Sequence, residues 1–180
     1  MSLFQQGDEP AYALLVQRYK DELTNFARRF LGDRDEADDV VQETFVRVWR
    51  KKHAYTAGAK FSTWIYTIAS NLAKTRLRRL SIRHFVRLGG DRADGPVFDL
   101  PDEGARPDGE ADDALREERI QHALESLAAR YREAIVLRDI QQLSYEEIVA
   151  ITGSAMGTVK SRINRARAVL RDQLRDLIRD

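Results

Sequence analysis

LSYEEIVAITGSAMGTVKSRINRARAVLR, residues 143–171, predicts two helices joined by a tight turn. Ser144 suits an N-cap because its hydroxyl can accept a hydrogen bond from an unpaired amide of the first turn, and Glu147, three residues later, completes a capping box. Gly153 tolerates the positive φ that a helix C-terminus often requires. Ser154 is then expected to cap the second helix. The pattern is that of a helix-turn-helix.

The second of these helices has two contrasting faces. Its apolar residues recur at helical spacing and predict a buried side made of Val159, Ile163, Ala166 and Leu170. The opposite face carries Lys160, Ser161, Asn164 and Arg165, and residues 158–171 contain basic but no acidic side chains. A face that only solvates a helical hairpin normally mixes both signs. The pattern therefore favours a helix that enters the major groove of DNA.

Composition excludes several other classes of protein. The 180 residues carry a net charge of +1 and no cysteine, so disulfides, thiolate metal sites and thiol catalysis are excluded. No apolar run approaches a membrane span, and the start MSLFQQGDEP lacks a signal pattern, so we expect a soluble, cytoplasmic protein without membrane insertion. There is no phosphate-binding glycine loop or HExxH motif, and His53, His84 and His122 are isolated. We expect no metal, no cofactor and no enzymatic activity.

The first half of the chain predicts two amphipathic helices. Apolar residues from Tyr12 to Phe30 repeat at three- and four-residue steps after Pro10, and Gly32 ends this helix. Residues 33–53 predict the next helix, whose acidic start DRDEADD suits the positive end of a helix dipole. Its apolar side includes Trp49, while its polar side is largely acidic. Periodicity alone favours dipole complementation and solvation for the acidic set over docking on a partner.

A loop, HAYTAGAK at residues 53–60, precedes a third helix that begins at Phe61. Aromatic residues at its start are followed by a basic stretch, TRLRRLSIRHFVR, without an acidic neighbour. Cations for phosphates and rings for unpaired bases suit nucleic acid. The alternative is that the rings are core anchors and the arginines solvate the surface, and for Trp64 a core position is favoured.

Residues 89–113 divide the chain. The segment is rich in Gly, Pro and Asp, has no helical period and carries nine acidic and two basic residues. It predicts a flexible acidic linker. The sequence thus predicts an all-α fold of two small helical domains, residues 1–88 and 114–180, joined by the linker at 89–113.

Two basic helical modules separated by an acidic linker resemble the bacterial sigma factors of the extracytoplasmic-function group. The resemblance covers almost the whole chain. GDEPAYALLVQRY, DEADDVVQETFVRVWR and FSTWIYTIASNLAKTRLRR follow the region-two pattern, and ESLAARYREAIVLRDIQQLSYEEIVAITGSAMGTVKSRINRAR follows region four. The order and spacing of these motifs make the resemblance specific. Several members have an aromatic residue where this chain has Asn164 and a proline where it has Ala155.

The resemblance implies a subunit that directs core RNA polymerase to promoters, with region two on the β′ coiled coil and region four on the β flap. An anti-sigma partner is also implied. The polymerase contacts would be Asp35, Asp38, Asp39, Gln42, Glu43, Arg47 and Trp49. The −10 element would be opened and read by Phe61, Ser62, Thr63, Trp64, Asn71, Lys74, Arg76, Arg78 and Arg79. The −35 element would be read by Ser144, Thr158, Lys160, Ser161, Arg162, Asn164, Arg165 and Arg167, with Arg162 and Arg167 nearer the DNA backbone.

Other functions remain open from the residues alone. A stand-alone helix-turn-helix regulator would bind duplex operators tightly without polymerase. A pure adaptor would use the acidic helix and leave the basic faces idle.

Overall fold

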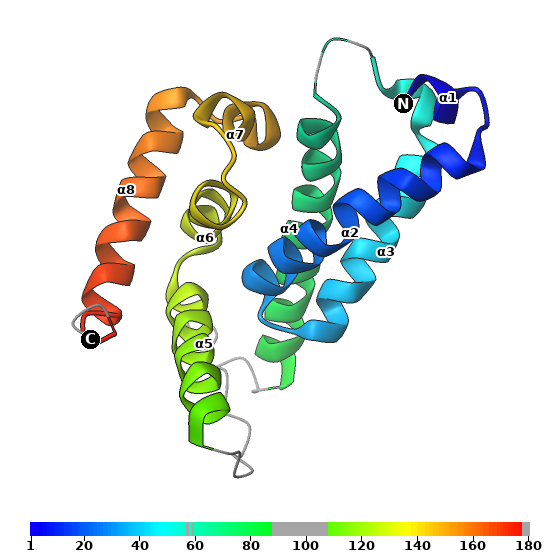
Figure 1. Ribbon diagram of the computed structural model, residues 1–180. Helices are drawn as coiled ribbons and strands as arrows, with labels where there is room; N and C mark the ends of the chain where they lie inside the picture. Colours follow the sequence, from blue (N-terminus) through cyan, green and yellow to red (C-terminus); the bar gives the residue numbers. More distant parts are fainter. Residues whose placement is uncertain (57, 59, 88–107, 178–180) are drawn as a thin grey trace.

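The computed structural model describes residues 1–56, 58, 60–87 and 108–177. Over these residues the fold is all-α, as predicted, with helices and turns and no strand. The helices form an N-terminal unit, α1 to α4, and a C-terminal unit, α5 to α8, which lie side by side (Figure 1). None of the helices described has the length and apolar character needed to span a bilayer.

Three long helices build the N-terminal unit: α2 (Glu9–Leu31), α3 (Arg34–Arg50) and α4 (Phe61–Arg87). The short helix α1 (Ser2–Gln5) and one 3-10 turn, η1 (Lys52–Ala54), lie at one end of this bundle. The largest side chains at its centre are fully buried: Phe4, Leu23, Phe26, Phe30, Ile65 and Tyr66.

Short-range signals in the sequence set the ends of these helices. The carboxylate of Asp8 accepts the amide of Ala11 at 2.7 Å, with Pro10 in the first turn, and Asp33 accepts the amide of Glu36 at 2.9 Å. Gly32 adopts φ 82°, and its amide donates to the carbonyl of Arg28. This left-handed residue lets α2 stop and α3 turn back beside it.

The C-terminal unit contains α5 (Asp108–Ser126), α6 (Ala129–Ile135), α7 (Tyr145–Thr152) and α8 (Met156–Gln173). Between α6 and α7 the chain forms one turn of π-helix, η2 (Val136–Ile140), followed by Gln142 at φ 55°. The guanidinium of Arg138 donates to the carbonyl of Leu143 at 2.7 Å, which closes this turn. This turn changes the direction of the chain between α6 and α7.

Three predicted boundaries differ from the observed ones. The helix predicted for residues 33–53 ends at Arg50 and is followed by η1. Helix α5 begins at Asp108, inside the segment predicted as linker, because its acidic residues suit a helix start. The tail RDQLRDLIRD, residues 171–180, alternates in charge and predicts an extension of the last helix, but α8 ends at Gln173. Residues 88–107, most of the predicted linker, lie outside the described residues.

The two units share a continuous core and a set of polar contacts. Buried apolar side chains of both units form one cluster. Glu133 of α6, which is 4 % exposed, accepts the hydroxyl of Ser70 and pairs with the ammonium of Lys74 at 3.0 Å. The hydroxyl of Tyr66 donates to Gln141 Oε1 at 2.6 Å. The C-terminal unit therefore packs on the face of α4 that carries Tyr66, Ser70 and Lys74, which are spaced four residues apart.

The Phe26→Ala substitution tests the core of the N-terminal unit. Phe26 is fully buried, with its ring centroid 5.7 Å from that of Tyr66 and 6.0 Å from that of Phe30. Removing the ring leaves a cavity, so we expect the free energy of unfolding to fall by about 3–5 kcal/mol. Urea titration followed by circular dichroism measures it. Leu14→Ala, at a residue that is 66 % exposed, should change it by less than about 0.5 kcal/mol.

Candidate nucleic-acid interface

The helix-turn-helix forms as its sequence predicts, except at the second cap. The hydroxyl of Ser144 accepts the amide of Glu147 at 3.2 Å, and the Glu147 carboxylate accepts the amide of Ser144 at 2.8 Å. These bonds hold the pKa of Glu147 below its usual range. Gly153 turns the chain at φ 67°. The prediction that Ser154 caps α8 is wrong: Ala155 is the N-cap residue, and the Ser154 hydroxyl instead accepts a bond from Arg162 at 2.9 Å.

Helix α8 presents its polar face to solvent. Val159, Ile163 and Ala166 are buried against α6 and α7, as predicted, while the residues of the opposite face are exposed. Figure 1 shows α8 on the side of the molecule away from α2, α3 and α4, so the N-terminal unit does not cover it. The exposed predicted contacts on it are Thr158, Lys160, Ser161, Asn164, Arg165 and Arg167.

Three arginines of α8 are held by neighbouring side chains. Arg167 makes two bonds to Asp139, at 2.9 and 2.6 Å, and this partner raises the pKa of Arg167. Arg165 donates to the hydroxyl of Tyr131 at 3.2 Å, which lowers the pKa of that hydroxyl. Lys160, Ser161 and Asn164 are exposed on this face, and the Lys160 ammonium lies 5.8 Å from the centre of the Tyr145 ring. Asp139 and Tyr131 were missed by sequence analysis, because contacts across 28 and 34 residues leave no local pattern.

Aromatic rings surround the start of α4. Phe61 lies with its ring centroid 5.3 Å from that of Tyr19 and 5.8 Å from that of Trp64, and Tyr55 of the preceding loop contacts both Phe61 and Trp64. Phe61, Ser62, Thr63 and Trp64 are each only partly buried, and Asn71 is exposed. Trp64 packs on the core, as favoured, but still reaches the surface. The cluster offers ring faces beside polar groups.

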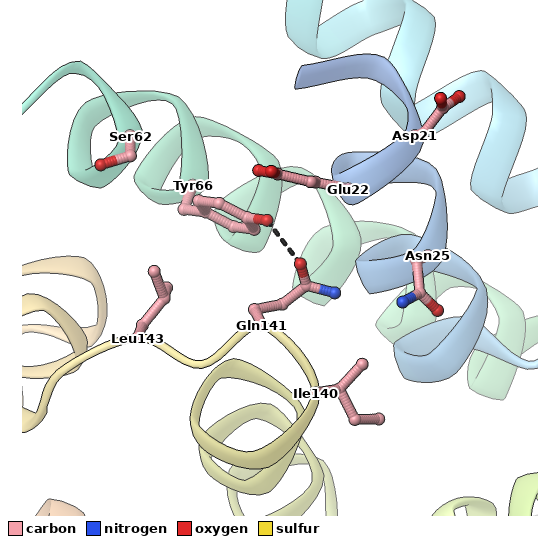
Figure 2. Close-up of a pocket in the computed structure, with 8 residues that line it drawn as sticks. All are labelled: Asp21, Glu22, Asn25, Ser62, Tyr66, Ile140, Gln141 and Leu143. Carbon is pink, nitrogen blue, oxygen red and sulfur yellow. Dashed lines mark hydrogen bonds between the residues drawn. The ribbon is translucent and has the colours of Figure 1, made fainter. Parts of the chain in front are cut away.

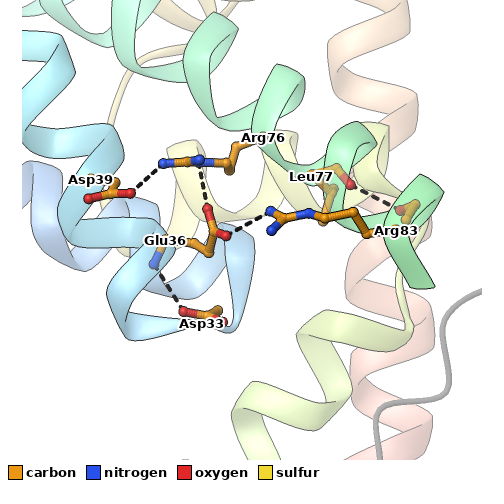
Figure 3. Close-up of polar contacts among 7 residues, drawn as sticks. Asp33, Glu36, Asp39, Arg76, Leu77 and Arg83 are labelled. Atoms are coloured by element: carbon orange, nitrogen blue, oxygen red, sulfur yellow. Dashed lines mark hydrogen bonds and ion pairs between the residues drawn. The ribbon is translucent and has the colours of Figure 1, made fainter. Parts of the chain in front are cut away.

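The basic residues farther along α4 are not equally available. Lys74 is paired with Glu133, and Arg76 is paired with Glu36 and, at 2.6 Å, with Asp39 (Figure 3). In this arrangement both cations are paired with carboxylates, and their contact with phosphate stays a prediction. Arg78 and Arg79 are exposed, and in the described part of the chain neither shows an ion pair. Among the α4 side chains that the structure describes, these two are the exposed cations without an ion pair.

The predicted polymerase contacts form an acidic face on α3. Asp39 is 61 % exposed and joins the ion-pair network with Arg76, while Asp38 lies 3.5 Å from Arg28. Arg47 donates to Glu43 at 2.8 Å and holds the pKa of that carboxyl below its usual value. Asp35 and Gln42 are exposed. Trp49 differs from the rest, because its ring packs on Phe4 and Tyr12 and is 36 % exposed.

A cleft of about 390 Å³ lies where the two units meet. Figure 2 shows Tyr66 and Gln141 bonded across it, with Asp21, Glu22 and Asn25 on the α2 side. Burial raises the pKa of Tyr66, so its hydroxyl stays protonated and donates. The two carboxylates repel phosphate, so this cleft does not extend the nucleic-acid surface. Among the described residues no group of three or more His, Asp or Glu is arranged to hold a metal ion.

These features define an all-helical protein with one open helix-turn-helix and a second basic helix that begins with aromatic rings. Residues 15–82 match the family model described as Sigma-70 region 2, and residues 117–170 match that of Sigma-70 region 4. The chain belongs to the extracytoplasmic-function group of the sigma-70 family of RNA polymerase sigma factors.

Named relatives resemble the chain over nearly its full length. It is 36 % identical over 174 residues to the ECF RNA polymerase sigma factor SigW of Bacillus subtilis, covering 96 % of this chain and 93 % of that protein. It is 34 % identical over 185 residues to the ECF RNA polymerase sigma-E factor of Escherichia coli strain K12, covering 97 % and 92 %.

Two solved structures share the fold. CnrH in complex with the cytosolic domain of CnrY matches with a TM-score of 0.71 and 27 % identity over 96 % of this chain and 92 % of that one. The sigma factor RpoE of Bartonella quintana, in complex with the anti-sigma factor NepR, matches with a TM-score of 0.71 and 28 % identity over 92 % and 97 %.

The Glu133→Gln substitution tests the contact between the two units. It removes the charge that pairs with Lys74, so we expect the contact to weaken by about 1–3 kcal/mol and the units to separate more often. The chain has no cysteine, so Leu14→Cys on α2 and Val169→Cys on α8 provide specific sites for two dyes. Energy transfer between the dyes should fall.

The control is Glu146→Gln, an exposed carboxylate on the neighbouring helix α7. It should leave energy transfer unchanged. Equal transfer in the Glu133→Gln and parent proteins would show that the ion pair does not hold the units together.

Proposed function

We propose that this protein is a promoter-specificity subunit that binds core RNA polymerase and directs initiation at promoters with −10 and −35 elements. One observation carries the proposal: a single chain that matches both sigma-70 regions presents an open recognition helix, α8, and a second basic helix, α4, that begins with exposed aromatic and polar side chains. The protein acts by binding, without chemistry of its own, in the cytoplasm where the polymerase works.

Helix α8 reads the −35 element. Lys160, Ser161 and Asn164 point outward and would face base edges in the major groove. An asparagine can make two hydrogen bonds to adenine, worth about 1–3 kcal/mol of discrimination against a wrong base. Arg162 and Arg167, held by Ser154 and Asp139, lie at the flanks of this face and would contact phosphates. Thr158 and Ser144 supply further hydroxyl donors.

The start of α4 captures an unpaired base of the −10 element. Extruding a base costs a few kcal/mol of stacking, which ring contacts and cationic contacts to the backbone can offset. Phe61 and Trp64 supply ring faces, Ser62, Thr63 and Asn71 supply hydrogen-bonding groups, and Arg78 and Arg79 supply charge. Lys74 and Arg76 join this surface only after they leave Glu133 and Asp39.

The acidic face of α3 binds the polymerase, on the β′ coiled coil, and the C-terminal unit binds the β flap. Asp35, Asp39 and Gln42 are the most accessible groups for this contact. Trp49 supports the α3 surface from its aromatic cluster and presents only part of its ring.

The two units separate on the promoter. The −10 and −35 positions differ by about 25 base pairs, or about 85 Å of B-form DNA. A folded chain of this length has a radius of gyration of only about 16 Å. With α4 and α7 in contact, α4 and α8 cannot reach both elements at once. The arrangement described here is therefore that of the protein away from the promoter.

An anti-sigma protein is the natural partner of this arrangement. The Bartonella RpoE, which shares the fold, is in complex with the anti-sigma factor NepR, and CnrH is in complex with the cytosolic domain of CnrY. We propose that a protein of this kind binds here and keeps the two units together.

Run-off transcription with core polymerase and a promoter library tests the proposed function. We expect stimulation that depends on both promoter elements. A protein that binds core polymerase but supports no promoter-dependent transcription would be an adaptor. A gel shift with promoter duplex separates the third possibility, because a stand-alone regulator would bind tightly without polymerase and a sigma factor would bind weakly.

The Asn71→Ala substitution should impair promoter opening more than closed-complex formation. Asn71 is exposed on α4, about two helical turns beyond Trp64, so its amide contributes only when an unpaired base arrives. Permanganate footprinting measures opening, and a footprint at low temperature measures the closed complex. An equal loss in both assays would contradict a role in base capture. Thr75→Ala, one turn farther along α4, is the matched control.

A further inference from the structure

The first residues of the chain contact the loop that precedes α4. Gln5, the last residue of α1, donates its side-chain amide to two backbone carbonyls, those of Lys52 at 2.8 Å and Tyr55 at 2.9 Å. Both hydrogens of the NH₂ group are therefore used. Two carbonyl acceptors also fix the orientation of the amide, because its own oxygen cannot accept from either.

The acceptors belong to the backbone that leads to α4. Lys52 begins the 3-10 turn η1, and Tyr55 is the residue that follows it. Gln5, about fifty residues away in sequence, therefore bridges the two ends of this turn. Loss of both bonds would loosen the loop backbone at these two positions.

Helix α1 is itself firmly anchored. Phe4 is fully buried, with its ring centroid 5.0 Å from that of Tyr12 and 5.5 Å from that of Trp49. The ammonium of Lys52 lies 5.4 Å from the centre of the Phe4 ring and 5.0 Å from that of Trp49. The rings hold the α1 backbone in place, so Gln5 reaches the loop from a fixed point.

The other side of Tyr55 faces the aromatic cluster at the start of α4. Its ring centroid lies 5.9 Å from that of Phe61 and 5.5 Å from that of Trp64. A change in the backbone at Tyr55 therefore moves a ring that packs on both. Through Tyr55, Gln5 thus connects α1 to the surface on which an unpaired base would stack.

We propose that Gln5 is a positioning residue for −10 recognition, which holds the loop at residues 52–56 in the conformation that lets the aromatic cluster discriminate the captured base. This inference rests on the proposed function of α4. Gln5 touches no base in this scheme. It acts on specificity through Tyr55.

The test uses Gln5→Met, which keeps the length of the side chain and removes the amide. The full-length protein is reconstituted with core polymerase and given four promoters that differ only at the captured −10 base. Two hydrogen bonds of ordinary strength correspond to roughly tenfold in an equilibrium constant. We expect the ratio of transcription between the best and the worst base to fall by about that factor, with binding to core polymerase and the melting temperature nearly unchanged.

Hydrogen exchange provides a second measurement that does not depend on transcription. Backbone amides of residues 52–56 should exchange about tenfold faster in the Gln5→Met protein, while those of α2 and α3 keep their rates. Gln6→Met is the matched control, because Gln6 is exposed and adjacent. Gln5→Glu tests the donors directly, since it keeps the shape but offers no N–H to the carbonyls, and it should behave like Gln5→Met.

Each outcome decides the inference. An unchanged base ratio and unchanged loop exchange in Gln5→Met overturn it, as does a wild-type ratio in Gln5→Glu. A uniform drop for all four promoters with reduced polymerase binding shows a merely structural role and also overturns it. If the wild-type protein supports transcription but prefers no base, both base capture by α4 and the role of Gln5 are wrong. If the Gln5→Met protein keeps the wild-type preference, only the role of Gln5 is wrong.

Discussion

At the contact between the two units lies one buried cation, Arg132 of α6, which is 3 % exposed. Its guanidinium donates to the carbonyl of Phe30 at 2.8 Å and to those of Glu125 and Leu127. These carbonyls belong to the C-terminal ends of α2 and α5, where unpaired groups carry partial negative charge. Burial lowers the pKa of Arg132, and the nearby Glu125 opposes the shift. The partial negative charge at two helix ends therefore stabilises the buried guanidinium in place of a carboxylate.

The contact between the units covers part of α4 but leaves the polar face of α8 uncovered. Helix α8 keeps its polar face open to solvent, while α4 gives Ser70 and Lys74 to Glu133 and Tyr66 to Gln141. The carboxylate that joins the units thus pairs with a cation that we propose for phosphate contact. Separation of the units would expose both groups to water, which can solvate them, and would leave Lys74 available for that contact.

Charge pairing also links the acidic and basic faces within the N-terminal unit. Arg76 and Arg83 of α4 share Glu36 of α3, and Arg76 reaches Asp39 as well (Figure 3). Asp39 and Arg83 are exposed, and pairs made by such residues add little stability, whereas Glu36 is only 15 % exposed. These ion pairs instead limit which groups can bind a partner. Asp39, predicted to face the polymerase, and Arg76, predicted to face DNA, neutralise each other unless a partner displaces one of them.

The sequence by itself determined the main helices, the cap at Ser144, the turns at Gly32 and Gly153 and the polar face of α8, because helical periodicity, N-cap residues and positive-φ glycines act within a few positions of one another. It also determined the family, through motifs that span both units. The tertiary structure alone decided which charged groups are open. Lys74 pairs with Glu133, 59 positions away, and Arg167 binds Asp139, 28 positions away. Gln5 binds the loop about fifty positions away. Contacts over such separations leave no periodic pattern in the sequence. Helix α6 brings Glu133 to Lys74 of α4. The packing of α8 on α6 brings Arg167 to Asp139 of η2, and the contact of α1 with η1 brings Gln5 to its two carbonyl acceptors.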